Sequence, residues 1–192
     1  KSYVITSKDK IAVLSNCVYL NYNGKYASFT DCGISGWGTG YRLDSVTMAH
    51  VRDKLSTDHP EFLFIQLKEP DAAGHANDSI GYVNGIINGD AFAREVWNIL
   101  QADEFYKDQT MFFVTNDHGR HSDGIADGYI SHGDDCEGCR HINLFMAGPD
   151  FKKDVIISND YDQIDIHKTI CDMLKLNGTF GSGKFIQDAL DR

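Results

Sequence analysis

The sequence lacks any long hydrophobic run and carries comparatively little positive charge. None of its apolar stretches approaches the roughly 18 residues that mark a membrane-spanning helix, so we expect no membrane span in this chain. Its 18 lysines and arginines are outnumbered by 28 acidic residues, which gives a net charge of −10. Polyanions repel a protein with this balance. The composition therefore argues against a nucleic-acid polymer as a partner, and it suits a protein that binds cations.

The cysteines form no regular framework. Five are present, an odd number without a repeated spacing. A chain of 192 residues is long enough to bury a sizeable core, so it needs no disulfides in order to fold. One or two bridges are compatible with the count, which leaves the redox compartment open. The sequence also lacks internal repeats, low-complexity segments and long linkers, so we expect residues 1–192 to form a single domain.

Strand-like and helix-like segments alternate along the chain. Runs of apolar residues predict buried strands at 61–67, 110–116 and 142–148, after shorter strand-like runs at 2–7 and 26–30. Helical spacing of apolar residues predicts helices at 44–56, 79–101 and 162–176, with Asp44 placed to cap the first and Asn177-Gly178 to end the last. This alternation predicts an α/β fold with a largely parallel sheet and helices on both faces.

Acidic and histidine side chains gather where the predicted buried strands begin or end. The positions are Asp71 and His75 after the strand at 61–67, Asp117 and His118 after that at 110–116, and His132 before that at 142–148. Ligands of α/β proteins bind outside the carboxyl ends of the strands. Mixed carboxylate and imidazole donors are those that zinc takes, whereas manganese or calcium is less suited to three imidazoles. The pattern therefore predicts a metal site.

These motifs resemble the metal-binding motifs of the alkaline phosphatase superfamily. The segments "PDAAGH", "TNDHG" and "SHG" occur in the family's order, and "EPDAAGH" is similar to a segment of the type I phosphodiesterase and nucleotide pyrophosphatase branch, which is related to the sulfatases. The closing "QIDIHKTICDMLKL" resembles the helix that ends the core of these enzymes. The resemblance covers roughly residues 60–176.

The resemblance implies two zinc ions in the full-length enzyme. Asp71, His75 and His132 would complete one metal site, and Asp117 and His118 would supply half of the second. Two metals about 4 Å apart clamp the attacking and leaving oxygens of a phosphoryl transfer. The implied activity is hydrolysis of small-molecule phosphate mono- or diesters, because sulfatases generally lack this histidine-rich set. A phosphosugar or phosphoglycerate mutase, a sulfatase and a non-catalytic metal-binding α/β module are the alternatives.

The family's nucleophile has no clear counterpart in this chain. Enzymes of the family use a Ser or Thr that lies upstream of the "PDxxxH" motif, together with an Asp from the first strand of the domain. Thr6, Ser7, Ser28 and Thr30 precede the motif here, but none sits at a strand-to-helix turn with an upstream Asp. We therefore expect the C-terminal portion of a larger catalytic domain, with its nucleophile upstream of Lys1 and with no activity alone. The family's habit favours a periplasmic or secreted protein.

A second group of candidate ligands lies in the segment "HGDDCEGCRH". Cys136 and Cys139 are flanked there by His132 and His141, as in a zinc knuckle. His132 is already required by the metal site that the resemblance implies. A local disulfide or two reduced thiols in a surface loop is therefore the preferred interpretation.

Overall fold

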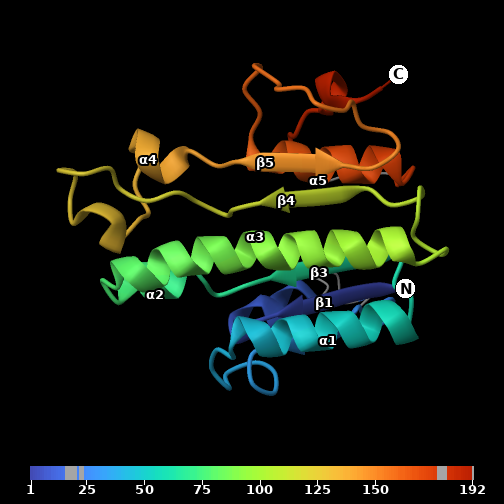
Figure 1. Ribbon diagram of the computed structural model, residues 1–192, viewed down its shortest axis with the longest axis horizontal. Coiled ribbons are helices and arrows are strands. Elements are labelled where there is room, and N and C mark those ends of the chain that lie inside the picture. Colours follow the sequence, from blue (N-terminus) through green and yellow to red (C-terminus); the bar gives the residue numbers. More distant parts are fainter. Residues whose placement is uncertain (16–20, 22–23, 177–180, 192) are drawn as a thin grey trace.

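The computed structural model describes residues 1–15, 21, 24–176 and 181–191 (Figure 1). Its elements follow in the order β1 (Ser2–Thr6), η1 (Asp9–Ser15), β2 (Phe29–Cys32), α1 (Asp44–Thr57), β3 (Phe62–Gln66), α2 (Asp71–His75), α3 (Ser79–Ala102), β4 (Phe112–Thr115), η3 (Gly128–Ile130), α4 (Glu137–Arg140), β5 (Leu144–Ala147), α5 (Gln163–Met173) and η4 (Gln187–Ala189). The predicted helix end at Asn177-Gly178 and the residue Cys17 lie outside the described residues.

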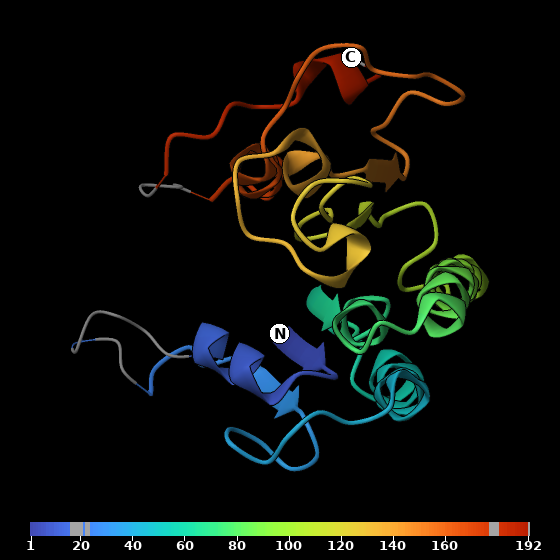
Figure 2. The same cartoon turned by 90° about the vertical axis from the view of Figure 1, so that its left-hand side faces the viewer.

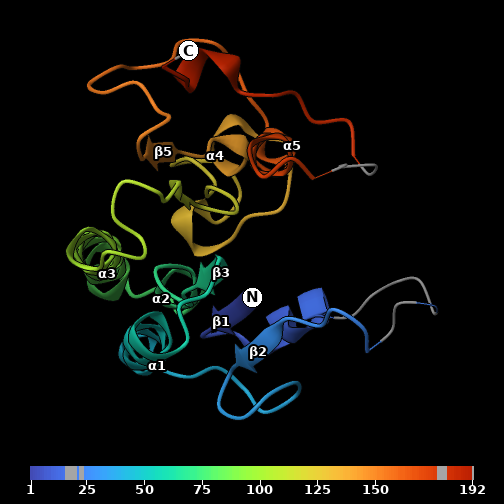
Figure 3. The same ribbon diagram turned by 90° about the vertical axis from the view of Figure 1, so that its right-hand side faces the viewer.

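A parallel sheet of three strands organises the N-terminal half and confirms the predicted α/β class. The strand order is β2-β1-β3, and Ile5 at the centre is in register with Asp31 on one side and Ile65 on the other. Helix α1 packs against β1 and α3, while η1 packs against β1 and β2. Figure 3 shows α1 on one side of these strands and the blue η1 on the other.

The core of this half is built by helical faces that cover the central strand. The buried side chains are Ile5, Met48, Val51, Leu55, Val96, Leu100 and Tyr106. Met48, Val51 and Leu55 recur at spacings of three and four, so they form one stripe of α1 that faces the sheet. Burial of each such side chain contributes about 1.5–3 kcal/mol to folding. This packing fixes β3, whose end leads to the predicted ligands Asp71 and His75.

Helix α3 reaches its predicted length, but only its C-terminal half enters the core. Val96 and Leu100 are buried, whereas Ile80, Val83 and Ile87 are 75%, 54% and 59% exposed. The reason is length, because α3 has 24 residues and its neighbour α1 has 14. None of the described helices is both long and apolar enough to cross a membrane.

Asp44 joins the ends of two strands instead of capping α1. The sequence places Asp44 as the N-cap, but that position is taken by Leu43, which makes no side-chain hydrogen bond. The Asp44 carboxylate accepts hydrogen bonds from the backbone N–H groups of Lys68 (2.8 Å) and Glu69 (3.1 Å), and from the Ser7 hydroxyl (2.5 Å). The strands end beside the first turn of α1, so their donors reach the carboxylate. Asp44 thereby fixes the backbone that leads from β3 into α2.

The strands predicted at 110–116 and 142–148 form a separate antiparallel pair, so their expected place in a parallel sheet is wrong. In this pair Phe113 is in register with Met146. A parallel arrangement requires a crossover that returns the chain to the opposite end of the sheet. The segment between β4 and β5 instead stays at the end where β4 finishes (Figure 1). The chain therefore re-enters as an antiparallel strand, and α5 and the C-terminal segment complete this half.

Candidate metal centre

The segments that carry the predicted ligands meet at one end of the molecule. Helix α2 follows β3, residues 116–121 follow β4, and residues 131–133 precede α4. Figure 1 shows α2 and the loops between β4 and β5 at the same end, and Figure 2 looks directly onto that end. Contacts between α2 and η3 confirm that the two regions touch. Residues far apart in the sequence are thus brought to one place.

Three histidine side chains face one oxygen of the Asp71 carboxylate. The Nε2 atoms of His75, His132 and His118 lie 3.3 Å, 3.5 Å and 3.9 Å from Asp71 Oδ1. The rings of His118 and His132 stack with their centroids 3.5 Å apart. The short helix α2 places Asp71 and His75 one turn apart, on the same face. Four potential ligands from three segments therefore converge.

Asp117 lies at the margin of this group. Its side chain is 64% exposed, and its Oδ1 is 3.6 Å from His118 Nε2. His118 is therefore slightly closer to Asp117 than to Asp71, as a division into two sites requires. One ligand atom each from Asp71, His118 and His132 nevertheless lie within 4.8 Å of one another. Asp71 and His132 belong both to this group and to the site predicted from the sequence, in which His75 is the third ligand. The assignment of His75 and His118 to different sites stays a prediction.

His118 and His132 are held in the form that a metal ligand needs. His118 Nδ1 lies 2.9 Å from the Gly119 carbonyl and donates to it, so the lone pair of Nε2 is directed toward Asp71. Burial lowers the pKa of His132 below its ordinary value, and the charges of His118 and Arg120 act in the same direction. His132 is therefore neutral at neutral pH, which is the ligating form of imidazole.

Two buried cations that the sequence analysis did not assign to the site lie against Asp71. Lys8 Nζ is 2.6 Å from Asp71 Oδ2, and the Lys8 side chain is only 4% exposed. The Arg120 guanidinium forms an ion pair with Oδ1 and donates to the backbone carbonyls of Asp71 (2.8 Å) and Ile130 (2.9 Å). Burial opposes the charge of Asp71, but Lys8 and Arg120 outweigh it and hold its pKa below the ordinary value. Asp71 is therefore ionised at neutral pH.

The position of one of these two cations in the sequence indicates that it lies near the site. Lys8 follows the end of β1 by two positions, so the rule that ligands gather at strand ends applies to it as well. Arg120 follows the "DHG" motif, and nothing in its neighbourhood points to Asp71. The two cations are separated from Asp71 by 63 and 49 positions, so these ion pairs depend on the tertiary structure.

The donor set fits a divalent metal ion. Zinc binds imidazole nitrogen and carboxylate oxygen at about 2.0–2.2 Å, so neighbouring ligands of a tetrahedral ion lie about 3.3 Å apart. The distances of 3.3 Å and 3.5 Å from Asp71 Oδ1 to His75 and His132 agree with that spacing. A set rich in imidazole suits zinc better than manganese or calcium. Metal binding also requires a deprotonated carboxylate and a neutral imidazole, which Asp71 and His132 provide.

Gly119 allows the loop that carries His118 to pack directly against α4. Its backbone N–H donates to the Cys139 carbonyl at 2.8 Å. A Cβ atom at position 119 would lie 1.9 Å from the Gly138 carbonyl oxygen, and one at position 138 would lie 2.3 Å from the Arg120 carbonyl oxygen. Both neighbours are backbone atoms and cannot rotate away. The two glycines therefore let the two segments approach within hydrogen-bonding distance.

Substitution of Gly119 should destabilise the protein by this contact alone. We expect Gly119→Ala to lower the free energy of unfolding by at least about 1–3 kcal/mol, the usual cost of overpacking. Gly89→Ala is the control, because a Cβ there meets nothing within 4 Å and α3 should gain up to about 1 kcal/mol. Urea denaturation of both variants in EDTA measures the difference. Equal stability of the two variants would contradict the packing described.

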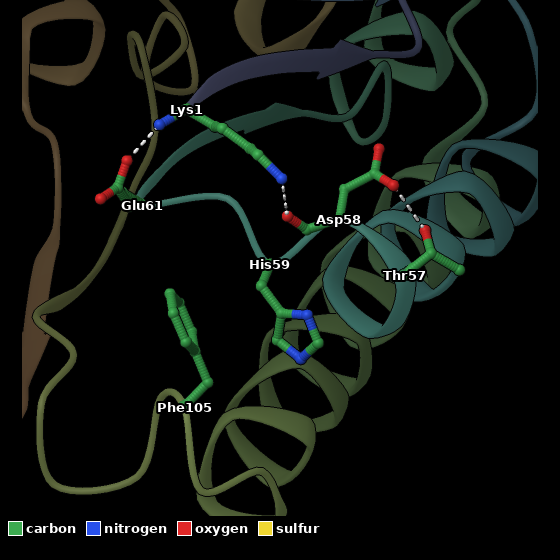
Figure 4. A pocket seen from close by; sticks show the side chains of 6 residues that line it. All are labelled: Lys1, Thr57, Asp58, His59, Glu61 and Phe105. Carbon is green, nitrogen blue, oxygen red and sulfur yellow. Dashed lines mark hydrogen bonds and ion pairs between the residues drawn. The ribbon is translucent and has the colours of Figure 1, made fainter.

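A surface pocket of about 390 Å³ lies at the other end of the molecule. It is lined by Lys1, Thr57, Asp58, His59, Glu61 and Phe105 (Figure 4). Lys1 Nζ donates there to the Asp58 carbonyl at 3.1 Å. The pocket adjoins the start of β1 and the end of α1, whereas the candidate ligands follow the carboxyl ends of the strands. The pocket therefore lies apart from the candidate metal ligands.

Comparison with known families gives a match that covers most of the chain. A family model described as "Metalloenzyme superfamily" matches residues 1–177. No curated protein and no solved structure matches the chain significantly.

Proposed function

Because the chain belongs to the Metalloenzyme superfamily, a branch of the alkaline phosphatase superfamily, we propose that it forms the metal-binding part of a zinc-dependent hydrolase of phosphate mono- or diesters. The resemblance to the alkaline phosphatase superfamily is thereby confirmed, and metal-dependent enzyme chemistry follows from it. The observation that carries the finer proposal is the convergence of three histidines on one oxygen of Asp71. The "EPDAAGH" segment favours the phosphodiesterase and nucleotide pyrophosphatase branch.

The side chains around Asp71 suit an anionic substrate. A divalent ion bound there would act as a Lewis acid that stabilises negative charge on a phosphoryl or leaving-group oxygen. Asp71 supplies an ionised carboxylate, and His75 and His132 supply imidazole nitrogens. Lys8 and Arg120 hold that carboxylate in place and add positive charge to a protein that is acidic as a whole. Fixed charges of this kind stabilise a charged transition state because they need no reorganisation.

The hydroxyl groups considered as nucleophiles are all committed to hydrogen bonds within the fold. The Thr6 hydroxyl donates to the Lys8 carbonyl, and the Ser7 hydroxyl binds Asp44 and Thr47. Ser28 pairs with the Ser2 hydroxyl, and Thr30 donates to the Ser28 carbonyl. A nucleophile has to be activated by a base or a metal. We therefore expect the attacking hydroxyl to come from outside these residues.

The 192-residue chain should bind zinc but should not hydrolyse phosphate esters by itself. We expect p-nitrophenyl phosphate and bis(p-nitrophenyl) phosphate to be turned over at the rate of the free metal ion. A longer form that supplies the nucleophile should hydrolyse at least one of them, and EDTA should abolish this turnover. Release of p-nitrophenol measures both. EDTA-sensitive turnover by the 192-residue chain would instead place the nucleophile within it.

A phosphosugar or phosphoglycerate mutase is the second candidate, because the superfamily of the matched model includes mutase-like members. A mutase moves the phosphoryl group within its substrate and releases no net phosphate. Phosphorus NMR of the longer form with a phosphosugar separates the two activities. Isomerisation without phosphate release would favour the mutase. Zinc binding without either activity would favour a non-catalytic metal-binding module.

A further inference from the structure

A second group of potential metal ligands lies beside the Asp71 site and shares no residue with it. It consists of His121, Asp134, Cys136 and Cys139, and one ligand atom from each lies within 4.8 Å of all the others. The pattern of the sequence suggests His132 and His141 as partners of the two cysteines. In the structure His132 faces Asp71 instead, and His141 is exposed to solvent. The two groups can therefore be filled independently.

The ring of His121 is oriented toward this second group by hydrogen bonds on its far side. Its Nδ1 lies 3.3 Å from Asp127 Oδ1 and 3.2 Å from the Ser131 hydroxyl, while the side chain is only 7% exposed. With the Nδ1 proton donated to Asp127, the lone pair of Nε2 points to Asp134 Oδ2 at 3.3 Å. A lone pair and a carboxylate oxygen repel each other at that distance unless a cation or a proton lies between them.

The two cysteines complete a compact set of four donors. Cys139 is buried, and its backbone N–H donates to Cys136 Sγ at 3.4 Å. The Cys136 N–H in turn donates to Asp134 Oδ1 at 3.0 Å, which fixes the carboxylate next to the sulfur atoms. Two sulfurs, an imidazole and a carboxylate are a donor set that selects zinc over magnesium, calcium or manganese. Four protein ligands also leave no position open for a substrate, which is typical of a structural site.

We propose that His121, Asp134, Cys136 and Cys139 bind a structural zinc ion that holds together the two segments carrying His118 and His132. His121 lies three positions after His118, and Asp134 lies two positions after His132. An ion bound at the second group therefore fixes both histidines from outside the Asp71 site. The close contact of Gly119 with the Cys139 carbonyl brings α4 to the same place. The proposal does not depend on the reaction that the Asp71 site performs.

Cobalt substitution provides the test, because cobalt bound to thiolate sulfur has an intense charge-transfer absorption in the near ultraviolet and the Asp71 site contains no sulfur. The reduced 192-residue chain is freed of metal, loaded with Co²⁺ and compared with three variants. We expect the band in the wild type, in His132→Ala and in Cys171→Ser, which removes a buried thiol of α5. We expect its loss in Cys136→Ser/Cys139→Ser, together with the loss of one zinc per chain by plasma mass spectrometry.

The outcomes separate this proposal from the proposed function. The proposal of a structural zinc would be overturned if the reduced wild type lacked the band, or if the double cysteine variant kept it unchanged. Neither result would contradict the proposed function of the Asp71 site. A band that persists in His132→Ala while that variant loses zinc affinity at the Asp71 site would support both sites. If the double variant does not fold, Asp134→Asn replaces it, because this ligand is 54% exposed. Its cobalt band should shift and its zinc should exchange faster, and an unaltered spectrum would count against Asp134 as a ligand.

Discussion

The His132→Ala variant is expected to lose metal binding at the Asp71 site. His132 belongs to both possible groupings of ligands, and its Nε2 lies 3.5 Å from Asp71 Oδ1. Loss of a residue that merely orients a ligand costs about 10–100-fold in metal affinity, so loss of the ligand itself should exceed that range. The measurement is a zinc titration by calorimetry. It is made in the Cys136→Ser/Cys139→Ser background, so that only the Asp71 site is observed.

His141→Ala in the same background is the matched control. His141 lies in the same segment of the chain, is exposed, and belongs to neither group of candidate ligands. The zinc affinity of the His141→Ala variant should equal that of the background protein. Equal affinities of the His132→Ala and His141→Ala variants would remove His132 from the site.

Two further variants test the division of the remaining ligands. His75 is closer to Asp71 Oδ1 than His118 is, at 3.3 Å against 3.9 Å. We therefore keep the prediction that Asp71, His75 and His132 form the tighter site, and that Asp117 and His118 form half of another. His75→Ala should weaken the first zinc to bind, and His118→Ala should leave it nearly unchanged. The reverse result would exchange their roles.

Removal of Arg120 is expected to have the largest effect on stability. Its guanidinium is 7% exposed and connects Asp71 in α2 with the Ile130 carbonyl, which lies 10 positions further along the chain from Arg120. Arg120→Met keeps most of the side-chain volume but leaves two carbonyl groups without this donor, and Asp71 with one cation fewer. Removing one partner of a buried ion pair costs about 3–5 kcal/mol of folding free energy. Because Asp71 keeps its ion pair with Lys8, we expect the lower value, a loss of about 3 kcal/mol in the free energy of unfolding. For a chain of this size that corresponds to a fall of about 6–12 °C in Tm.

Arg94→Met provides the comparison for this loss. Arg94 and its partner Asp90 are each 74% exposed on α3, and exposed pairs of this kind contribute at most about 0.5 kcal/mol. Both variants are unfolded thermally in EDTA, so that a change in metal binding does not enter the result. A similar Tm for the two variants would show that Arg120 is not the connection described.

The amino-acid sequence by itself determined the elements and the candidate ligands. Runs such as "EFLFIQL" predict a strand from local composition, and Asp71, His75, Asp117, His118 and His132 are recognisable because they adjoin such runs. The predicted burial of this strand is wrong in part, because β3 lies at the edge of its sheet and Phe62 and Phe64 are 39% and 37% exposed. Both inferences use residues that are neighbours in the chain. For the same reason, the helical spacing predicts the helices at 44–56 and 79–101 within one residue at each end.

The tertiary structure decided which of these elements and side chains meet. It made β4 and β5 an antiparallel pair, placed Lys8 and Arg120 on Asp71, and left Ile80, Val83 and Ile87 exposed. It also joined the two cysteines to His121 and Asp134 instead of His132 and His141. Each of these outcomes depends on contacts between residues that are distant in the sequence. The hydrophobic pattern specifies that a face is buried, but the neighbour that covers it is selected only when the whole chain folds.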